Sequence, residues 1–349
     1  MRALAMVDVT VMGAGIFGLS VAWECQSRGA HVRVIDPGGP GAGASGGIVG
    51  ALAPHVPENW NDKKAFQFDS LLRAETFWAE VQAVSGLSPG YARTGRLQPI
   101  ADEAALALAR ARAVTADTLW QGRARWQVVE ARDFGFAPTS ATGFLIHDTL
   151  TARLHPRRAC AALAEAIRMR GGEILTDGAP QGRVLWATGV AGLEELSAAR
   201  GRVVGNAVKG QSALLHFVAA DQPQLFADTV HIVPHEDGTV AVGSTSERDF
   251  DDPHSTDTRL DDVIDRAMRA APVLHGARVV ERWAGLRPRT RSRAPMLGAH
   301  PLRDGAFVAN GGFKIGFGMA PRVGQVMADL ILEGRDNVPS GFRPEASTS

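Results

Sequence analysis

Residues 7–36, VDVTVMGAGIFGLSVAWECQSRGAHVRVID, predict a strand, a tight turn, a helix and a second strand in close succession. The first strand is indicated by β-branched residues at alternate positions, Val7, Val9 and Val11. It leads directly into GAGIFG, residues 13–18, whose three glycines leave room only for a tight turn. This order of elements is typical of a parallel βαβ unit.

The residues after the turn have the spacing of a helix with one buried face. Ile16, Leu19 and Trp23 recur at three- and four-residue steps, and Gly29 follows as a natural helix stop. Residues 31–35, HVRVI, then supply the second strand. The helix therefore connects two strands that should lie side by side in one sheet.

Each glycine of the turn has a separate physical task in a dinucleotide site. Gly13 permits the sharp turn, Gly15 lets backbone amides approach a pyrophosphate, and Gly18 lets the helix lie close to the strand. The helix N-terminus points unpaired N–H groups at the phosphates. Asp36 ends the second strand, where a carboxylate can bind both adenosine ribose hydroxyls and would repel the 2′-phosphate of NADP. The alternative is a doubly wound domain whose first turn is tight for packing alone.

Composition narrows the possible partners. The 349 residues carry 37 basic and 37 acidic side chains, and this zero formal net charge disfavours broad binding to nucleic acid or anionic membranes. The leading segment MRALAM is too short for a signal peptide, and no apolar stretch has the length of a membrane span. We therefore expect a cytoplasmic protein with no nucleic-acid or membrane partner, while its oligomeric state is not readable from these patterns.

A second glycine-rich segment follows the acid. Residues 37–56, PGGPGAGASGGIVGALAPHV, suit a backbone that runs closely along an extended ligand, with Ala44 and Ser45 near phosphate or sugar. A flexible surface loop is the alternative. The apolar residues Ile48 and Leu52 favour the ligand-binding interpretation because they would seek a core.

The glycine turn, the acid and the segment ASGGIVGAL, residues 44–52, together resemble FAD-dependent oxidases of the D-amino-acid oxidase superfamily. The glycine oxidase and sarcosine oxidase branches are the most similar. This resemblance implies an α/β protein, α+β overall: a Rossmann-like FAD-binding domain of the glutathione-reductase type and a mixed, largely antiparallel substrate domain. An NAD-dependent dehydrogenase would have no need of the second segment.

The resemblance also implies which residues contact FAD. Near the N-terminus they are Gly13, Gly15, Ile16, Phe17, Gly18, Asp36, Pro37, Ala44, Ser45, Gly50, Ala51 and Leu52. Two later segments resemble the family's second nucleotide signature and its flavin-contacting loop, and they add Ala187, Thr188, Gly189, Gly312, Phe313, Lys314, Ile315 and Gly316. The helix after this loop would point its positive end at the flavin. The segment between Gly172 and Arg183 is shorter than in the family, which leaves the adenine-side contacts open.

Three residues are expected at the substrate. In the family, the arginine of a GLRP sequence binds the substrate carboxylate, and Arg287 occupies that position; the alternative is a basic loop that also includes Arg289. Lys314 lies where sarcosine oxidases have lysine in a similar GFK setting, and would be a second anchor or else a solvent-facing loop residue. His231, in TVHIVP, aligns with a substrate-facing tyrosine of glycine oxidases, or is a structural strand histidine.

The resemblance therefore implies an enzyme that oxidises the C–N bond of a small amino acid or secondary amine by hydride transfer to FAD. Glycine, sarcosine or a D-amino acid is the expected substrate class, and oxygen or another acceptor reoxidises the flavin. The closest alternative is an amino-acid dehydrogenase that uses a non-oxygen acceptor such as a quinone. Others are the tRNA-modifying flavoprotein branch and a non-catalytic FAD-binding subunit of a larger complex.

We predict that FAD is bound without a covalent link. The chain has two cysteines, Cys25 and Cys160, expected as buried thiols, and neither lies near the GLRP segment where covalent-flavin sarcosine oxidases have theirs. Acid precipitation of the purified protein should therefore release all yellow colour into the supernatant. Colour that stays in the pellet after washing would contradict this prediction.

The remaining patterns outline two domains. Residues 1–55, 145–202 and 284–338 are expected to form the FAD-binding domain, residues 56–144 and 203–283 the substrate domain, and residues 339–349 a frayed polar tail. Helices are predicted near 61–84 and 102–118, and residues 203–285 read mainly as strands and hairpins with an Asp-Gly turn in HEDGT. Residues 243–259, charged and turn-rich, are predicted to be a solvated connection. No metal site is indicated.

Overall fold

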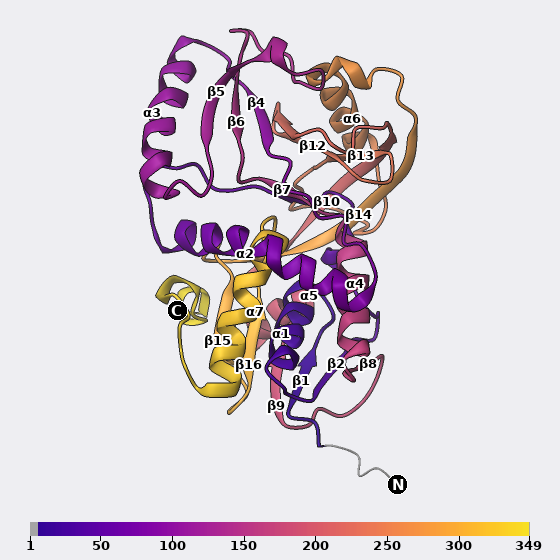
Figure 1. Cartoon of the computed structure of the whole chain (residues 1–349). Coiled ribbons are helices and arrows are strands. Elements are labelled where there is room, and N and C mark those ends of the chain that lie inside the picture. The colour runs from indigo at the N-terminus through magenta and orange to yellow at the C-terminus, as the bar shows by residue number, and fades with distance from the viewer. Residues whose placement is uncertain (1–5, 349) are drawn as a thin grey trace.

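Two sheets organise the chain. The computed structural model describes residues 6–348, and Figure 1 shows a six-stranded sheet in the lower half and an eight-stranded sheet in the upper half. The six-stranded order is β15-β16-β9-β1-β2-β8. Its strands are β1 (Val9–Met12), β2 (Val32–Ile35), β8 (Glu173–Leu175), β9 (Arg183–Trp186), β15 (Met296–Ala299) and β16 (Phe307–Asn310). All neighbours are parallel except β15, which pairs antiparallel at the edge.

The βαβ unit predicted from residues 7–36 is confirmed. Helix α1 (Ile16–Ser27) connects β1 to β2, which pair in parallel from Val9↔Val32 to Met12↔Ile35. The helix ends where expected, because Gly29 adopts a left-handed φ of 92°. The α/β class with a Rossmann-like sheet is therefore correct.

Helices cover the six-stranded sheet. They are α1, α4 (Pro156–Met169), α5 (Gly189–Arg200) and α7 (Gly316–Glu333), while α2 (Asp62–Ser85) crosses between the two halves of the molecule. Apolar side chains of α1, α2, α4 and α7 share one hydrophobic core. Figure 1 shows indigo α1 beside yellow α7, so segments from opposite ends of the chain lie next to each other. Gly324 of α7 makes this close packing possible, since a Cβ there would lie 2.7 Å from the Ser20 carbonyl oxygen of α1.

The eight-stranded sheet is mixed and largely antiparallel, as predicted. Its order is β14-β10-β13-β12-β11-β4-β6-β5, and only β11 and β4 pair in parallel. The strands are β4 (Arg96–Pro99), β5 (Trp126–Glu130), β6 (Phe144–Asp148), β10 (Gly205–His216), β11 (Gln224–Ala227), β12 (Val230–Pro234), β13 (Thr239–Gly243) and β14 (Val279–Thr290). A small third sheet joins β3 (Ala51–Leu52) to β7 (Ala152–Arg153). Helix α3 (Glu103–Leu119) also lies where the sequence predicted a helix.

One segment is helical where the sequence predicted no helix. Residues 258–270 form α6, where we predicted only strands and a solvated connection. Asp257 caps its N-terminus by accepting a hydrogen bond from the Arg259 amide, and Leu260, Val263, Ile264 and Ala267 are buried on one face. The helical spacing was present in the sequence, but the charged residues around it hid the short apolar stripe.

The end of the chain is packed, so the expectation of a frayed tail is wrong for its described residues. Residues 340–342 form the turn η4 (Ser340–Phe342), and residues 345–348 form α8 (Glu345–Thr348). Phe342 is buried against Phe66, with ring centroids 5.0 Å apart. The Ser347 hydroxyl donates to Ser292 Oγ at 3.0 Å. An aromatic anchor in an otherwise polar stretch was the available signal.

The division into an FAD-binding and a substrate domain remains a prediction, and strand β14 bears on its boundary at residue 284. Strand β14 pairs along its length with β10, from Thr290↔Gly205 to Val279↔Leu215. The boundary at residue 284 therefore falls within a single strand. We propose that residues 284–290 go with the eight-stranded sheet.

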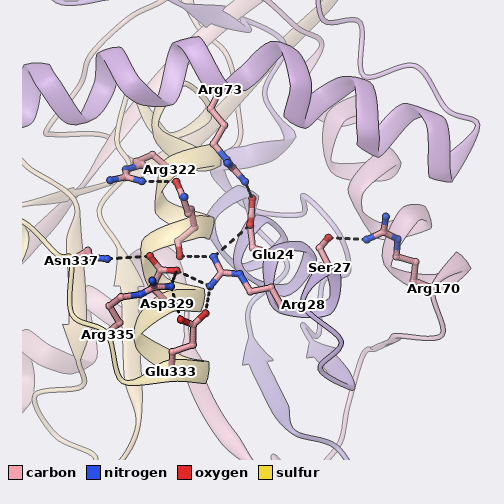
Figure 2. A network of polar contacts seen from close by, with 11 residues as sticks. Glu24, Ser27, Arg28, Arg73, Arg170, Arg322, Asp329, Glu333, Arg335 and Asn337 are labelled. Atoms are coloured by element: carbon pink, nitrogen blue, oxygen red, sulfur yellow. Dashed lines mark hydrogen bonds and ion pairs between the residues drawn. The ribbon is translucent and has the colours of Figure 1, made fainter.

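Charged residues join α1, α2 and α7 in one network (Figure 2). Arg28 of α1 donates to Asp329 of α7 at 2.7 Å and to Glu333 at 3.0 Å, and Arg73 of α2 donates to Glu24 of α1 at 2.5 Å. Asp329 is buried and also accepts from Arg335 and Asn337. Burial raises the pKa of Asp329, but the hydrogen bonds from Arg28 and Asn337 and the charges of Arg28 and Arg335 outweigh it, so the net pKa is lowered.

Replacing Asp329 with asparagine should lower the free energy of unfolding by about 1–3 kcal/mol at pH 7, because Arg28 and Arg335 lose a buried anionic partner. The folded pKa of Asp329 lies below its unfolded value of about 3.9, so this stabilisation is present above that pH and is lost as pH falls through the folded pKa. Urea unfolding at pH 7 and at about pH 3 measures both effects.

The matched control for this experiment is Asp336→Asn. Asp336 pairs with Arg343 at 2.7 Å, but both side chains are exposed, so we expect a change below about 1 kcal/mol. A loss in Asp329→Asn that persists undiminished in acid would show that the carboxylate charge is not its cause.

Candidate active site

The glycine turn is tight for reasons that the structure makes explicit. Gly13 has a φ of 109°, and a Cβ there would lie 2.4 Å from the Ala187 carbonyl oxygen. A Cβ on Gly18 would lie 2.0 Å from the Gly13 carbonyl oxygen, so the helix could not pack on the turn. Gly15 is different, because its φ of −76° is open to any residue and its Cβ would approach only Ser45 Oγ, at 3.3 Å. The free space beside Gly15 supports its predicted role at a ligand.

The second glycine-rich segment lies against this turn. The Ser45 hydroxyl accepts a hydrogen bond from the Ile16 amide at 2.9 Å, and the Gly41 amide donates to the Ala14 carbonyl at 2.9 Å. Ala44 and Ser45 belong to the short turn η1 (Ala44–Gly46). The structure therefore brings Ser45 to the N-terminus of α1, as the sequence led us to expect.

Asp36 lies at the same edge of the sheet, followed directly by Pro37. Its carboxylate accepts from the Ala14 amide at 2.7 Å and the Gly38 amide at 2.9 Å. These bonds hold both oxygens in place at the end of β2, and each oxygen keeps lone-pair capacity for a ribose hydroxyl. The position supports the expected role of Asp36 in ribose binding.

The segment after β9 reaches this edge as well. The Ala187 amide donates to the Met12 carbonyl at 2.7 Å, and the Gly189 carbonyl accepts from the Asn310 side chain at 2.8 Å. Residues 187–189, with Thr188 at the N-cap of α5, thus lie between the ends of β1 and β16.

Residues 50–52 are placed differently from the other predicted contacts. A Cβ on Gly50 would lie 1.8 Å from the Leu154 carbonyl oxygen, so neighbouring backbone already accounts for glycine there. Ala51 is half-buried in β3, and the adjacent Leu52 has no exposed surface and belongs to the hydrophobic core. Of these three residues only Ala51 has appreciable exposed surface, so it is the one best placed for the predicted contact with FAD.

The loop of residues 311–316 brings a second helix end to the first. A Cβ on Gly312 would lie 3.1 Å from the Phe17 ring, and one on Gly316 would lie 3.6 Å from the Ile16 side chain. Gly316 begins α7 after its N-cap residue Ile315, so the N-termini of α1 and α7 converge. Two positive helix ends at one place form a suitable environment for an anionic cofactor. The cradle of Gly15, Ser45, Asp36 and Gly312 therefore fits FAD.

Arg287 is held by backbone and hydroxyl groups. Its guanidinium lies directly over Gly210 of β10, where a Cβ would be 2.0 Å from Arg287 Cζ. It donates to Ser244 Oγ at 2.7 Å and to the Thr245 carbonyl at 3.2 Å. Burial lowers the pKa of Arg287 to about 10, against the opposing charge of Glu247, so the side chain remains a cation at neutral pH. Neither partner neutralises it, which leaves its charge available for an acid group.

Lys314 lies within the electrostatic field of Arg287. Its pKa is lowered to about 8, first by desolvation and then by the charges of Arg287 and Arg289. The side chain is exposed to solvent, and the nearby cations disfavour its charged form. Lys314 Nζ and Arg289 Cζ lie 5.8 Å and 5.4 Å from the centre of the Phe313 ring.

His231 completes the group. It pairs with Gly243 across β12 and β13 and its ring lies 4.6 Å from that of Phe226. Burial, and then the positive charges of Arg96, Lys314 and Arg287, together lower the pKa of His231 to about 3. The imidazole is therefore neutral at working pH, so it is a hydrogen-bonding group and a poor acceptor for an ammonium proton. The three residues predicted at the substrate therefore lie within electrostatic range of one another.

The residues that support Thr245, and through it Arg287, were not predicted from the sequence. The Thr245 hydroxyl accepts from the Gln211 amide at 2.8 Å and donates to Glu247, and the Gln211 side chain donates to Glu247 at 3.0 Å. Gln211 and Glu247 are buried. The available signal was a pair of polar residues, Gln211 and Ser212, within the apolar strand of residues 205–216.

Within residues 6–348, no three His, Cys, Asp or Glu side chains are grouped as a metal ion would require. No helix in that same part of the chain combines the length and apolarity needed to cross a bilayer.

Comparison with known proteins places the chain among flavoproteins. The family model DAO, described as FAD dependent oxidoreductase, matches residues 8–330. A glycine oxidase of Bacillus licheniformis is 25% identical over 359 residues, covering 93% of both chains. The crystal structure of glycine oxidase from Geobacillus kaustophilus has a TM-score of 0.82 at 21% identity and covers 96% of this chain and 97% of that one. The structure of iminodiacetate oxidase from Chelativorans sp. BNC1 has a TM-score of 0.83 at 22% identity, covering 96% and 98%.

Proposed function

Because the chain belongs to the DAO family of FAD dependent oxidoreductases, we propose that it oxidises the C–N bond of a small amino acid or secondary amine. The observation that carries this proposal is the pair of cations, Arg287 and Lys314, beside the converging ends of α1 and α7. The match to a relative named glycine oxidase covers 93% of that protein, and this similarity supports an amino-acid substrate.

Arg287 binds and orients the substrate carboxylate. Its planar guanidinium matches the two carboxylate oxygens, and its bonds to Ser244 and Thr245 set its direction before substrate arrives. Lys314 supplies a second charge to the same carboxylate. FAD held at this edge would supply the hydride acceptor, so that the α-C–H bond of the substrate could be oxidised to an imine, which water would hydrolyse to an oxo acid and ammonia or a smaller amine.

The substrate amine must be neutral for this reaction. Arg287 and Lys314 favour the neutral amine because a further positive charge is unfavourable beside them, and the neutral His231 does not offset this repulsion. His231 can hydrogen-bond the amine or its carboxylate without a charge of its own. The chain thus orients the substrate and selects its protonation state.

Substrate affinity should fall as pH rises through about 8, because Lys314 loses its proton there. The cationic form prevails below the pKa, so carboxylate binding is strongest on the acidic side. Titration of flavin absorbance with the unreactive carboxylate acetate, from pH 6 to pH 10, is the measurement.

Two variants test the assignment of this change to Lys314. Lys314→Met should weaken acetate binding at pH 7 and remove the loss near pH 8, whereas Lys314→Arg should keep strong binding to higher pH. An unchanged pH profile in Lys314→Met would contradict the assignment.

The proposal is tested with a panel of substrates under anaerobic conditions. Purified holoprotein is mixed with glycine, sarcosine, D-alanine and D-proline, and the flavin absorbance is recorded. Bleaching by any member supports an amine-oxidising enzyme, and recovery of colour on admitting air assigns an oxidase. Bleaching that recovers only with a quinone assigns a dehydrogenase. A flavin that no member reduces favours the non-catalytic subunit and overturns the proposal.

A further inference from the structure

An arginine-lined cavity of about 840 Å³ opens beside the site just described. It lies at the end of the β10–β14 pair, between the start of β10, the end of β14 and the loop after β13. Its charged lining consists of five arginines and one aspartate: Arg202, Arg248, Asp249, Arg289, Arg291 and Arg293. The whole chain is formally neutral, so this concentration of positive charge is local.

Three of these arginines, Arg248, Arg289 and Arg293, differ from the arginines that form ion pairs. Arginines such as Arg28 and Arg96 form ion pairs with buried carboxylates. Among the ion pairs of residues 6–348, none joins Arg248, Arg289 or Arg293 to an acid. Gathered cations repel one another, and an arrangement of this kind is typical of a site for an anionic ligand.

One residue, Arg289, connects the cavity with the proposed carboxylate anchors. Arg289 lines the cavity, and it also lies over the Phe313 ring and lowers the pKa of Lys314. Arg287 and Arg289 are two residues apart on β14, so they lie on the same face of the strand with Cα atoms roughly 7 Å apart. A small molecule with two acid groups a few bonds apart can span this distance.

We propose that the arginine-lined cavity binds a second acidic group of the substrate. The substrate class is then an amino acid or secondary amine with two acid groups, one held by Arg287 and Lys314 and the other by Arg289 and Arg248. This inference rests on the proposed function for its first anchor. The second anchor depends only on the cavity and its charges.

Binding of unreactive acids to the holoprotein tests the inference. Flavin absorbance is titrated with acetate, which has one carboxylate, and with succinate, which has two. We expect succinate to bind at least about tenfold more tightly than acetate, and this ratio to fall as salt is raised from about 0.05 to 0.5 M. In Arg248→Gln and Arg289→Gln the ratio should fall towards one. Arg110→Gln, an exposed arginine on α3, is the matched control and should keep the wild-type ratio.

Three titration outcomes would overturn the inference. The first is equal affinity of the wild type for acetate and succinate. The second is a preference for succinate that survives both arginine substitutions. The third is inorganic phosphate that binds together with succinate rather than competing with it. The last would show that the cavity takes a separate anion. Flavin reduction by glycine without any preference for two acid groups would also overturn it and leave the proposed function standing. Tight succinate binding in a protein whose flavin no amine reduces would support anion binding in the cavity and overturn the proposed function.

Discussion

Replacing Arg287 with alanine should raise the apparent Michaelis constant for the amino-acid substrate about 10²-fold, while FAD stays bound. The guanidinium is fixed over Gly210 by Ser244 and Thr245 and keeps its charge at neutral pH. Hydrogen bonds to charged groups contribute about 1.5–3 kcal/mol, and about 1.4 kcal/mol corresponds to a factor of ten. Steady-state kinetics with the amine that bleaches the flavin, together with the flavin absorbance of the purified variant, measure both parts.

Two variants separate carboxylate binding from general damage to β14. Arg282→Ala removes an exposed arginine of the same strand that pairs with Asp261, and it should leave the Michaelis constant within about twofold. Arg287→Lys keeps the charge but lacks the planar fork, so we expect an intermediate defect. Near-normal affinity for amino acids in Arg287→Ala would remove the central support of the proposed function.

Replacing Gly15 with alanine should weaken FAD binding by about 10- to 100-fold without unfolding the protein. The backbone of Gly15 accepts alanine because φ is −76°, and the new Cβ would approach only Ser45 Oγ, at 3.3 Å. It would, however, project into the space where the backbone is expected to approach the pyrophosphate. FAD content after purification and fluorescence titration of the apoprotein measure the affinity.

Thermal unfolding of the apoprotein supplies the control for this variant. Its stability should change by no more than about 1 kcal/mol, since the added methyl group meets little of the protein. Gly135→Ala, at a glycine with open space around it in the connection from β5 to β6, should change neither FAD content nor stability. If Gly15→Ala retains stoichiometric FAD with wild-type affinity, the cofactor does not lie against this turn.

The parts of the structure that were predictable share a physical basis. Alternating valines, the glycine hexapeptide and the helical spacing of residues 16–23 are local patterns, because the buried face of an element repeats with its own period. Asp36 followed from the same unit, since a parallel βαβ pair brings the end of β2 next to the turn. The first βαβ unit and the position of Asp36 beside its turn could therefore be predicted from the sequence.

Helix α6 and the packed tail were not predicted, for a different reason. Their apolar anchors, such as Leu260 and Phe342, stand among charged or polar residues, so the local signal was weak. Burial against distant partners stabilises both segments. Such stabilisation depends on the assembled core and not on the segment's own composition.

The amino-acid sequence by itself determined the dinucleotide turn and pointed to Arg287 and Lys314 through their motifs. Tertiary structure alone decided that these residues meet His231, that Ser244 and Thr245 hold the guanidinium, and that arginines from three separate segments line one cavity. The physical reason is register: pairing of β10 with β14 places Gly210 under Arg287, and no periodicity within either strand specifies that alignment.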